Sequence, residues 1–164
     1  MAKKAPAKSA QPQLAVGERV KPDTPPSVPS RKLDVFDNPN PGRDYVIQFQ
    51  IPEFTCFCPL TGQPDFAHFT IDCIADKLCI ELKSLKMYMW SYRNDGAFHE
   101  KVTNDILEDM VKAINPRFLR ITAKWYVRGG IYTNVVVEHR KKGWKPAPRV
   151  DLPQHSSETG LLGQ

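Results

Sequence analysis

Apolar and polar residues alternate strictly over residues 66–73, which predicts a half-buried β-strand. The residues expected to face the core are Ala67, Phe69, Ile71 and Cys73. A similar alternation over residues 78–83 predicts a second strand, and Ala75-Asp76 can turn the chain between the two. We therefore expect residues 66–73 and 78–83 to form a hairpin. An apolar, β-prone run over residues 45–51 predicts a further strand before it.

A second pair of strands is predicted later in the chain. Alternation over residues 119–128 gives one strand with an expected buried face. This face consists of Leu119, Ile121, Ala123, Trp125 and Val127. Residues 131–139 follow directly after Gly129-Gly130 and predict the partner strand. So short a connection favours an antiparallel hairpin.

Two helices are predicted between the strand pairs. Ser84 is a plausible N-cap for a short helix that runs to Arg93, where Asn94-Asp95-Gly96 can close it. A second helix is indicated by apolar residues at intervals of three and four. They are Phe98, Val102, Ile106, Met110 and Ala113. Asn115-Pro116 is expected to end this helix.

The order strand pair, helix pair, strand pair predicts an α+β domain with antiparallel strands. We place this domain at residues 42–142, with order beginning near Arg43. Residues 1–41 hold eight of the fifteen prolines and few large apolar residues, so we expect a disordered tail there. The polar, Pro-containing residues 143–164 predict a loose C-terminal tail.

The net charge of +5 resides in the predicted tail. Residues 1–32 carry seven Lys or Arg and two acids, which leaves sixteen of each sign in residues 33–164. A nucleic-acid-binding domain is expected to hold its own basic excess, so we expect no direct nucleic-acid partner for the folded part. Trp90, Tyr92 and Tyr126 are among more aromatic residues than one small sheet needs to cover, which predicts a homo-oligomer.

The cysteine pattern predicts a reducing, cytoplasmic setting. Four cysteines, clustered between residues 56 and 79, are too few for a secreted disulfide scaffold. No apolar signal run stands at the N-terminus, and no apolar stretch approaches the length of a membrane span. We interpret Cys56 as an inert packing residue.

Cys58 and Asp65 form a candidate reaction centre. They flank Thr61-Gly62-Gln63-Pro64, a cluster typical of a turn, and a chain reversal there would bring the two side chains together. A thiol and a carboxyl in a sheltered place can exchange a proton, which gives a nucleophile and an acid.

Three motifs in order carry a resemblance to a known family. The first reads Cys-Pro-x-Thr-Gly-Gln-Pro-Asp-Phe from Cys58, the second Glu-Leu-Lys-Ser-Leu-Lys-Met-Tyr from Glu81, and the third is Phe98-His99-Glu100. In these motifs the chain resembles the NADPH-dependent 7-cyano-7-deazaguanine reductases, the nitrile reductases of queuosine biosynthesis. Its length resembles the short, one-module branch of that family.

The resemblance implies a role for each matching residue. Cys58 matches the nucleophile, which adds to the nitrile to give a thioimidate, and Asp65 matches the proton donor. The implied substrate-binding residues are Ile80, Glu81, Leu82, His99 and Glu100. The implied NADPH-binding residues are Lys83, Ser84, Lys86, Arg128 and Gly129. The sequence has no Gly-x-Gly-x-x-Gly motif, so a Rossmann-type cofactor site is not supported.

The resemblance also implies the reaction and the assembly. The expected reaction uses two NADPH to reduce the nitrile to a primary amine, giving 7-aminomethyl-7-deazaguanine for tRNA modification. The expected fold is the tunnelling fold, in which subunits form rings with sites between neighbours. A decamer of two pentamers is expected for the short branch.

Two alternatives remain open at this stage. One is a zinc-dependent enzyme of the same fold, with ligands drawn from the cysteines, His68 and His99, although Cys-x-Cys without a second close pair is poor zinc spacing. The other is a non-catalytic, RNA-associated module that uses the basic tail and exposed aromatic residues.

Overall fold

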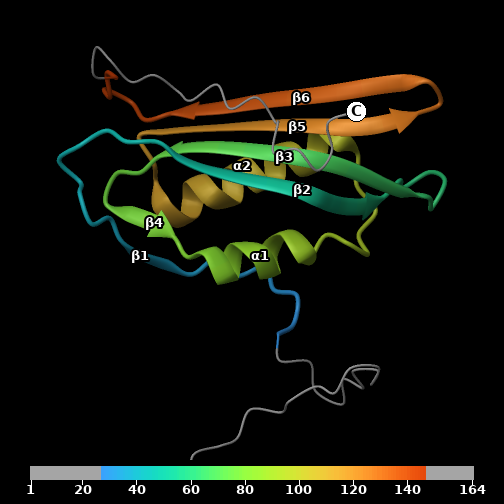
Figure 1. Cartoon of the computed structure of the whole chain (residues 1–164), viewed down its shortest axis with the longest axis horizontal. Coiled ribbons are helices and arrows are strands. Elements are labelled where there is room, and N and C mark those ends of the chain that lie inside the picture. Colours follow the sequence, from blue (N-terminus) through green and yellow to red (C-terminus); the bar gives the residue numbers. More distant parts are fainter. Residues whose placement is uncertain (1–26, 147–164) are drawn as a thin grey trace, which may run out of the picture.

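Four long strands form one antiparallel sheet in the order β2–β3–β5–β6 (Figure 1). A computed structural model describes residues 27–146. The strands are β2 (Ile47–Phe57), β3 (Pro64–Ile74), β5 (Phe118–Arg128) and β6 (Ile131–Arg140). The expected α+β class, with antiparallel strands and two helices, is confirmed.

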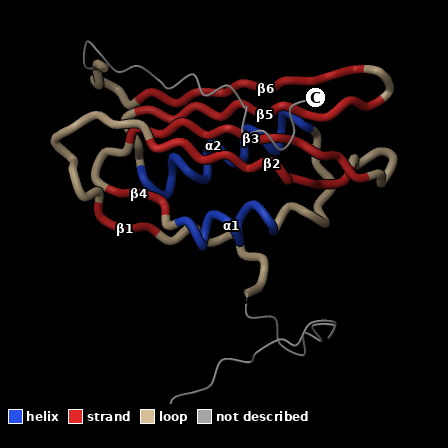
Figure 2. The backbone as a smooth tube through the Cα atoms, in the orientation of Figure 1, coloured by secondary structure: helices blue, strands red, loops and turns tan. Residues whose placement is uncertain are grey.

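Both helices lie on the same side of this sheet (Figure 2). They are α1 (Leu82–Trp90) and α2 (His99–Ile114). Val102, Ile106 and Met110 of α2 are fully buried in the same core cluster as Phe69 and Ile71 of β3. The apolar periodicity of both elements therefore produces the core, as the sequence predicts. None of the helices in residues 27–146 is both long and apolar enough to cross a membrane.

The predicted hairpin between residues 66–73 and 78–83 is wrong. β3 pairs with β2 on one edge and with β5 on the other. Because both edges of β3 are taken, β4 (Leu78–Ile80) leaves the sheet and pairs instead with β1 (Val35–Asp37). β1 lies within the residues assigned to the tail, whereas residues 1–26 and 147–164 of the predicted tails fall outside the described residues.

The predicted cap of the first helix is also wrong. Glu81 is the N-cap of α1, and its carboxylate accepts hydrogen bonds from the backbone N–H of Lys83 at 2.8 Å and of Ser84 at 2.7 Å. The strand therefore stops before Glu81, because a carboxylate there satisfies two N–H groups that the first helical turn leaves free. Ser84 is buried within the helix.

Two residues expected in the core are exposed. Phe98 is the N-cap of α2 and precedes the helical repeat, so its side chain is 52% exposed. Val127 is 50% exposed, since the pairing register of β5 and β6 shifts between Trp125 and Arg128. The predicted end of α2 is confirmed, because Asn115 adopts a left-handed conformation directly before Pro116.

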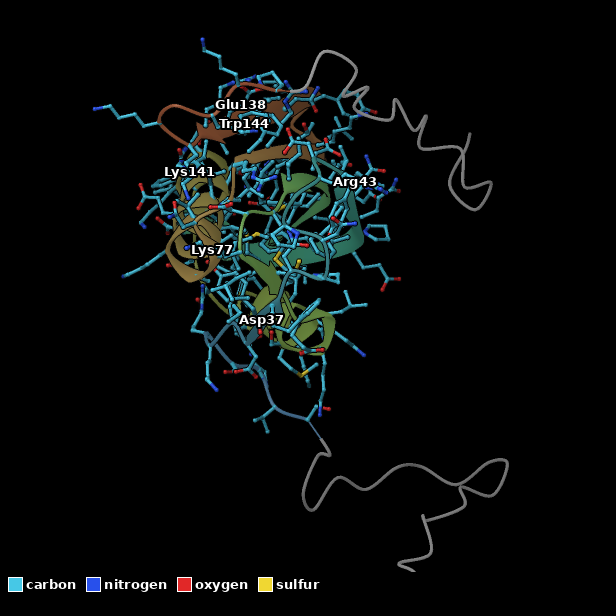
Figure 3. All side chains as sticks on the ribbon, turned by 90° about the vertical axis from the view of Figure 1, so that its left-hand side faces the viewer. Asp37, Arg43, Lys77, Glu138, Lys141 and Trp144 are labelled. Carbon is cyan, nitrogen blue, oxygen red and sulfur yellow. The ribbon has the colours of Figure 1, made fainter. Side chains whose placement is uncertain are left out.

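A set of ion pairs, here called the clasp, lies at one end of the sheet, where Figure 3 labels Lys141 and Trp144. Arg117 donates to Asp44 at 2.8 Å, and Lys141 donates to Asp76 at 2.6 Å. Trp144 adds a hydrogen bond from Nε1 to Asp44 at 3.2 Å. These contacts attach the segment before β2 and the segment after β6 to the same corner of the domain.

Candidate active site

Cys58 lies at the start of the turn that joins β2 to β3. Its N–H donates to the carbonyl of Gln63 at 2.8 Å, and its own carbonyl accepts from Gly62 at 2.9 Å. Gly62 has a φ of 66°, a left-handed conformation that glycine adopts at low cost. The predicted chain reversal is therefore confirmed. In the β2–β3 ladder next to this turn, Cys56 pairs with Asp65. The Cys58 thiol and the Asp65 carboxyl therefore lie at the same end of the hairpin.

The Cys58 thiol is unusually acidic for a buried group. A hydrogen bond from the Thr61 side chain is the main reason that its pKa falls to about 7, and the backbone N–H groups of Thr61 and Leu60 act in the same direction. A hydrogen bond from the Arg128 guanidinium lowers it further, whereas burial opposes these effects. At neutral pH a large fraction of Cys58 is therefore thiolate, the reactive form of cysteine.

Asp65 is buried and has two cationic or polar partners. Nη1 of Arg128 donates to both carboxylate oxygens at 2.8 Å, and Nε2 of His99 lies 3.2 Å from Oδ2. Only 6% of the Asp65 side chain is exposed, against 46% for Arg128. Arg128 therefore joins the carboxyl of Asp65 and the thiol of Cys58 into one cluster.

His99 is the first residue of α2 and has a fixed orientation. Its ring stacks on Trp125 of β5, with ring centroids 3.8 Å apart and an interplanar angle of 6°. Trp125 in turn packs edge-on against Phe54 and Phe69 in the core. The sequence placed Trp125 on the buried face of a strand but gave no sign of this stacking, which depends on how α2 crosses the sheet.

A hollow of about 270 Å³ opens beside these groups. Its lining includes Pro59, Asp65, His99, Glu100 and Arg128. Glu100 is exposed in the first turn of α2, with its carboxylate free of any hydrogen-bond partner in the described part of the chain. The hollow thus offers the Glu100 carboxylate, the His99 imidazole and the nearby Cys58 thiol to a small polar molecule, while the Asp65 carboxylate is paired with Arg128.

Cys56 and Cys73 are poor nucleophiles. Cys56 is fully buried, and desolvation raises the pKa of its thiol to about 11. Burial also raises the pKa of Cys73 to about 12. These values support the interpretation of Cys56 as a packing residue, because the thiolate is inaccessible at neutral pH.

The remaining predicted site residues form a second group around the start of α1. A groove of about 1210 Å³ lies between β2 and α1, and its lining includes Glu81, Leu82, Lys83, Lys86 and Arg93. Neither His99 nor Asp65 lines this groove. The single chain therefore divides the predicted residues between two places.

Three predicted residues have particular surroundings. Ile80 is buried at the end of β4. The Ser84 hydroxyl donates to the carbonyl of Glu81 at 2.8 Å and accepts from the N–H of Asp34 at 2.9 Å. Gly129 lies in the β5–β6 turn with a φ of 60°. With Arg128, this glycine belongs to the Cys58 side of the molecule and not to the groove beside α1.

The ligands suggested for zinc do not come together. Within residues 27–146, no three His, Cys, Asp or Glu side chains are grouped so that they could hold a metal ion. All four cysteines are free and buried.

Comparisons with known proteins agree with one another. The QueF-like protein family matches residues 64–144. An NADPH-dependent 7-cyano-7-deazaguanine reductase of Thiobacillus denitrificans is 63% identical over 138 residues, which are 84% of this chain and 99% of that protein. The reductase of the same name from Nitrosomonas europaea is 67% identical over 124 residues, covering 76% and 89% of the two chains.

A solved structure supports the fold. The crystal structure of the archaeosine synthase QueF-Like in the apo form superposes with a TM-score of 0.53 and 25% identity, covering 57% of this chain and 91% of that one. This likeness confirms the predicted tunnelling fold. Together with the high identity to the reductases over almost their whole length, it shows that the chain belongs to the NADPH-dependent 7-cyano-7-deazaguanine reductase family.

Proposed function

We propose that this protein reduces the nitrile of 7-cyano-7-deazaguanine to the primary amine with NADPH, in the biosynthesis of queuosine for tRNA. The observation that carries the proposal is the Cys58 thiol, buried with a pKa of about 7 beside Asp65 and the hollow. The names of the 57–67% identical relatives support it. Besides hydride, a covalent nitrile reduction needs a nucleophile and a proton donor, and we assign these two roles to Cys58 and Asp65.

Cys58 performs the first step as a nucleophile. Its sulfur forms a bond to the nitrile carbon, and one electron pair of the C≡N bond moves to nitrogen, which gives a thioimidate. That nitrogen needs a proton as the bond forms, and we assign the donation of this proton to Asp65. His99 lies within hydrogen-bond distance of Asp65 and can return a proton to it.

Release of Cys58 follows the first reduction of the carbon. When bound, NADPH supplies the two hydrides that take this carbon from the nitrile to the amine. Between the two reductions the C–S bond breaks and the sulfur leaves with the bonding electrons. The hydrogen bonds from Thr61 and Arg128 favour this step, because they stabilise the departing thiolate.

Glu100 is proposed to recognise the base. A guanine-like edge presents a ring N–H and an exocyclic amine side by side, and one carboxylate accepts both. The hollow places Glu100 and His99 next to each other at the start of α2. Stacking on Trp125 keeps the His99 ring in one orientation toward the bound base.

The groove beside α1 fits a phosphate-bearing dinucleotide. It has a volume of about 1210 Å³ and carries three cationic side chains, from Lys83, Lys86 and Arg93. Lys83 and Lys86 are exposed and free to meet phosphate groups. We assign NADPH to this groove, and the proposed contacts of Ser84, Arg128 and Gly129 stay predictions.

We infer that a complete site forms between two subunits. The hollow is lined by Asp65 and Glu100 and by Pro59, the neighbour of Cys58. The groove beside α1 is lined by Glu81, Lys83 and Lys86. Three large apolar residues that line the hollow are exposed, namely Phe98 (52%), Tyr126 (48%) and Ile131 (68%). Such a patch favours cover by another copy of the chain. The decamer of two pentamers stays a prediction.

The test is NADPH consumption with 7-cyano-7-deazaguanine, measured for the wild type, Cys58→Ala and Cys56→Ala. We expect two NADPH oxidised per amine formed in the wild type and in Cys56→Ala, and none in Cys58→Ala. Cys56→Ala is the matched control because it removes a buried thiol two residues away. Turnover by Cys58→Ala would exclude covalent catalysis, and an inactive wild type would overturn the proposed reaction.

A further inference from the structure

The segment that joins the two helices supports the end of β2 at the nucleophile. The N–H of Phe57 donates to the carbonyl of Asp95 at 2.9 Å, and the N–H of Ala97 donates to the carbonyl of Phe57 at 3.0 Å. Phe57 and Gly96 thus form an isolated parallel bridge. This bridge fixes the residue directly before Cys58.

Gly96 adds a packing contact on the other side of Cys58. A Cβ atom at Gly96 would lie 3.5 Å from Cα and Cβ of Pro59, so the two backbones are close. The same segment continues into His99 and Glu100 at the start of α2. Its position therefore decides both how Cys58 is held and how far it lies from the residues proposed to bind the base.

Arg31 binds the segment that joins the two helices through its exposed side chain. Its guanidinium forms an ion pair with the Asp95 carboxylate and lies 3.4 Å from the ring centroid of Tyr92. Tyr92 is buried, and its phenolic oxygen lies 2.8 Å from that of Tyr88. Tyr88 in turn donates to Asp109 of α2 at 2.6 Å. Arg31 thus rests on a ring that is hydrogen-bonded to Tyr88 of α1, and Tyr88 connects it to Asp109 of α2.

The residues on either side of Arg31 are tied to α1. The N–H of Ser30 donates to the carbonyl of Met87 at 3.2 Å, and the N–H of Asp34 donates to the Ser84 hydroxyl at 2.9 Å. The carbonyl of Asp34 accepts from Glu81 at 2.9 Å. Arg31 is therefore carried by a backbone with fixed ends, which lowers the entropic cost of holding its side chain on Asp95.

We propose that Arg31 is a positioning residue for Cys58. It acts through Asp95, which holds Phe57 by its backbone carbonyl and leads to Gly96 against Pro59. The side chains of Arg31 and Asp95 are 44% and 50% exposed, and exposed ion pairs contribute little to global stability. Loss of Arg31 is therefore expected to affect the reactivity of Cys58 more than the folding of the domain.

The experiment compares Arg31→Gln with Lys32→Gln, which removes the neighbouring cation that pairs with Asp34. The first readout is the rate of Cys58 alkylation by iodoacetamide against pH, which needs neither substrate nor NADPH. It rests on the thiol alone, so it remains informative even if the proposed reaction is wrong. The second readout is kcat and KM with 7-cyano-7-deazaguanine, and the third is Tm.

We expect Arg31→Gln to slow alkylation several-fold and to lower kcat about tenfold with KM little changed, since misplacement of a reacting group reduces the rate of the chemical step. Lys32→Gln should match the wild type. Arg31→Lys should recover part of the rate, because it keeps a cation beside Asp95 and Tyr92. Asp95→Asn should reproduce Arg31→Gln, and the double variant should be no slower than either, as for residues that act as a unit.

Three results would overturn the proposal. The first is wild-type alkylation and kcat in Arg31→Gln. The second is an equal fall in the alkylation rate and kcat of Lys32→Gln, which would point to the charge of the segment rather than to the contact with Asp95. The third is a fall in the alkylation rate and kcat of Arg31→Gln that does not occur in Asp95→Asn, whether or not the Tm of Arg31→Gln falls.

Discussion

The reactivity of Cys58 originates in the turn that follows it. Hydrogen bonds from Thr61 and from backbone N–H groups lower the pKa of the thiol, while the same burial that raises the pKa of Cys56 to about 11 acts against them. Two cysteines separated by one residue thus differ in pKa because only one of them lies at the end of a strand, where backbone N–H groups are free to donate.

Thr61→Val removes the main hydrogen bond to the thiol. We expect the pKa of Cys58 to rise from about 7 toward the ordinary value of about 8.5, so alkylation at pH 7 should slow about tenfold. The measurement is the pH dependence of the alkylation rate. Thr122→Val, on β5 of the same sheet, is the control and should keep the wild-type profile. An unchanged pKa in Thr61→Val would show that the backbone donors suffice.

The sequence revealed the parts of the site that are local in the chain. Cys58 and Asp65 could be found because a seven-residue spacing across turn-forming residues joins them. The ion pair between Arg128 and Asp65 could not be found, since it spans 63 residues and depends on the pairing of β3 with β5. The stacking of His99 on Trp125 depends likewise on tertiary packing.

At the scale of elements, the apolar periodicity predicted which strands and helices form but not which strands pair with each other. The strands β3 and β5 and the helix α2 follow their apolar repeats closely. The alternation near residue 78 is real, but the pattern carries no information on which strand edges are already occupied. β1 has three residues and no apolar repeat, so only its pairing with β4 identifies it as a strand.

The clasp gives a prediction at this scale. Lys141 is the main cause of the lowered pKa of Asp76, so the ionised pair stabilises the folded state above the unfolded-state pKa of Asp76, near 3.8. That contribution is lost as pH falls through the lower, folded-state pKa. Lys141→Met should therefore reduce the free energy of unfolding by about 0.5–1 kcal/mol at pH 7.

Urea unfolding at pH 7 and at a pH below the folded-state pKa of Asp76 measures this effect. The difference between Lys141→Met and the wild type should be present at pH 7 and vanish in acid. Lys142→Met removes the adjacent, exposed cation and is expected to have the stability of the wild type. A difference that persists unchanged in acid would indicate a packing role for the Lys141 side chain.

At the scale of the whole molecule, the residues proposed for catalysis and those proposed for NADPH lie beside two separate cavities. The hollow is lined by Asp65 and Glu100 and by Pro59, the residue after Cys58, whereas the groove beside α1 is lined by Lys83 and Lys86. A ring in which each subunit places its groove beside a neighbour's hollow would complete both. The same arrangement would cover the exposed apolar residues around the hollow.

Subunit complementation tests this arrangement. Cys58→Ala and Lys86→Met are each expected to be inactive, but co-expression in equal amounts should restore about a quarter of the wild-type activity, because one site in four then pairs two intact halves. Mixing Cys58→Ala with Asp65→Asn is the matched control and should restore none, as both residues belong to the same half. Absence of recovery in the first mixture would place the whole site within one subunit.

The contrast among the thiols has a practical consequence for the cell. Electrophiles and peroxides react with thiolates, and at neutral pH the buried Cys56 and Cys73 present almost none. Chemical modification should therefore occur at Cys58 in preference to Cys56 and Cys73, so that a single modified sulfur atom inactivates a site while these two buried thiols stay reduced. For the same reason, a mild alkylating agent should count functional sites by direct titration.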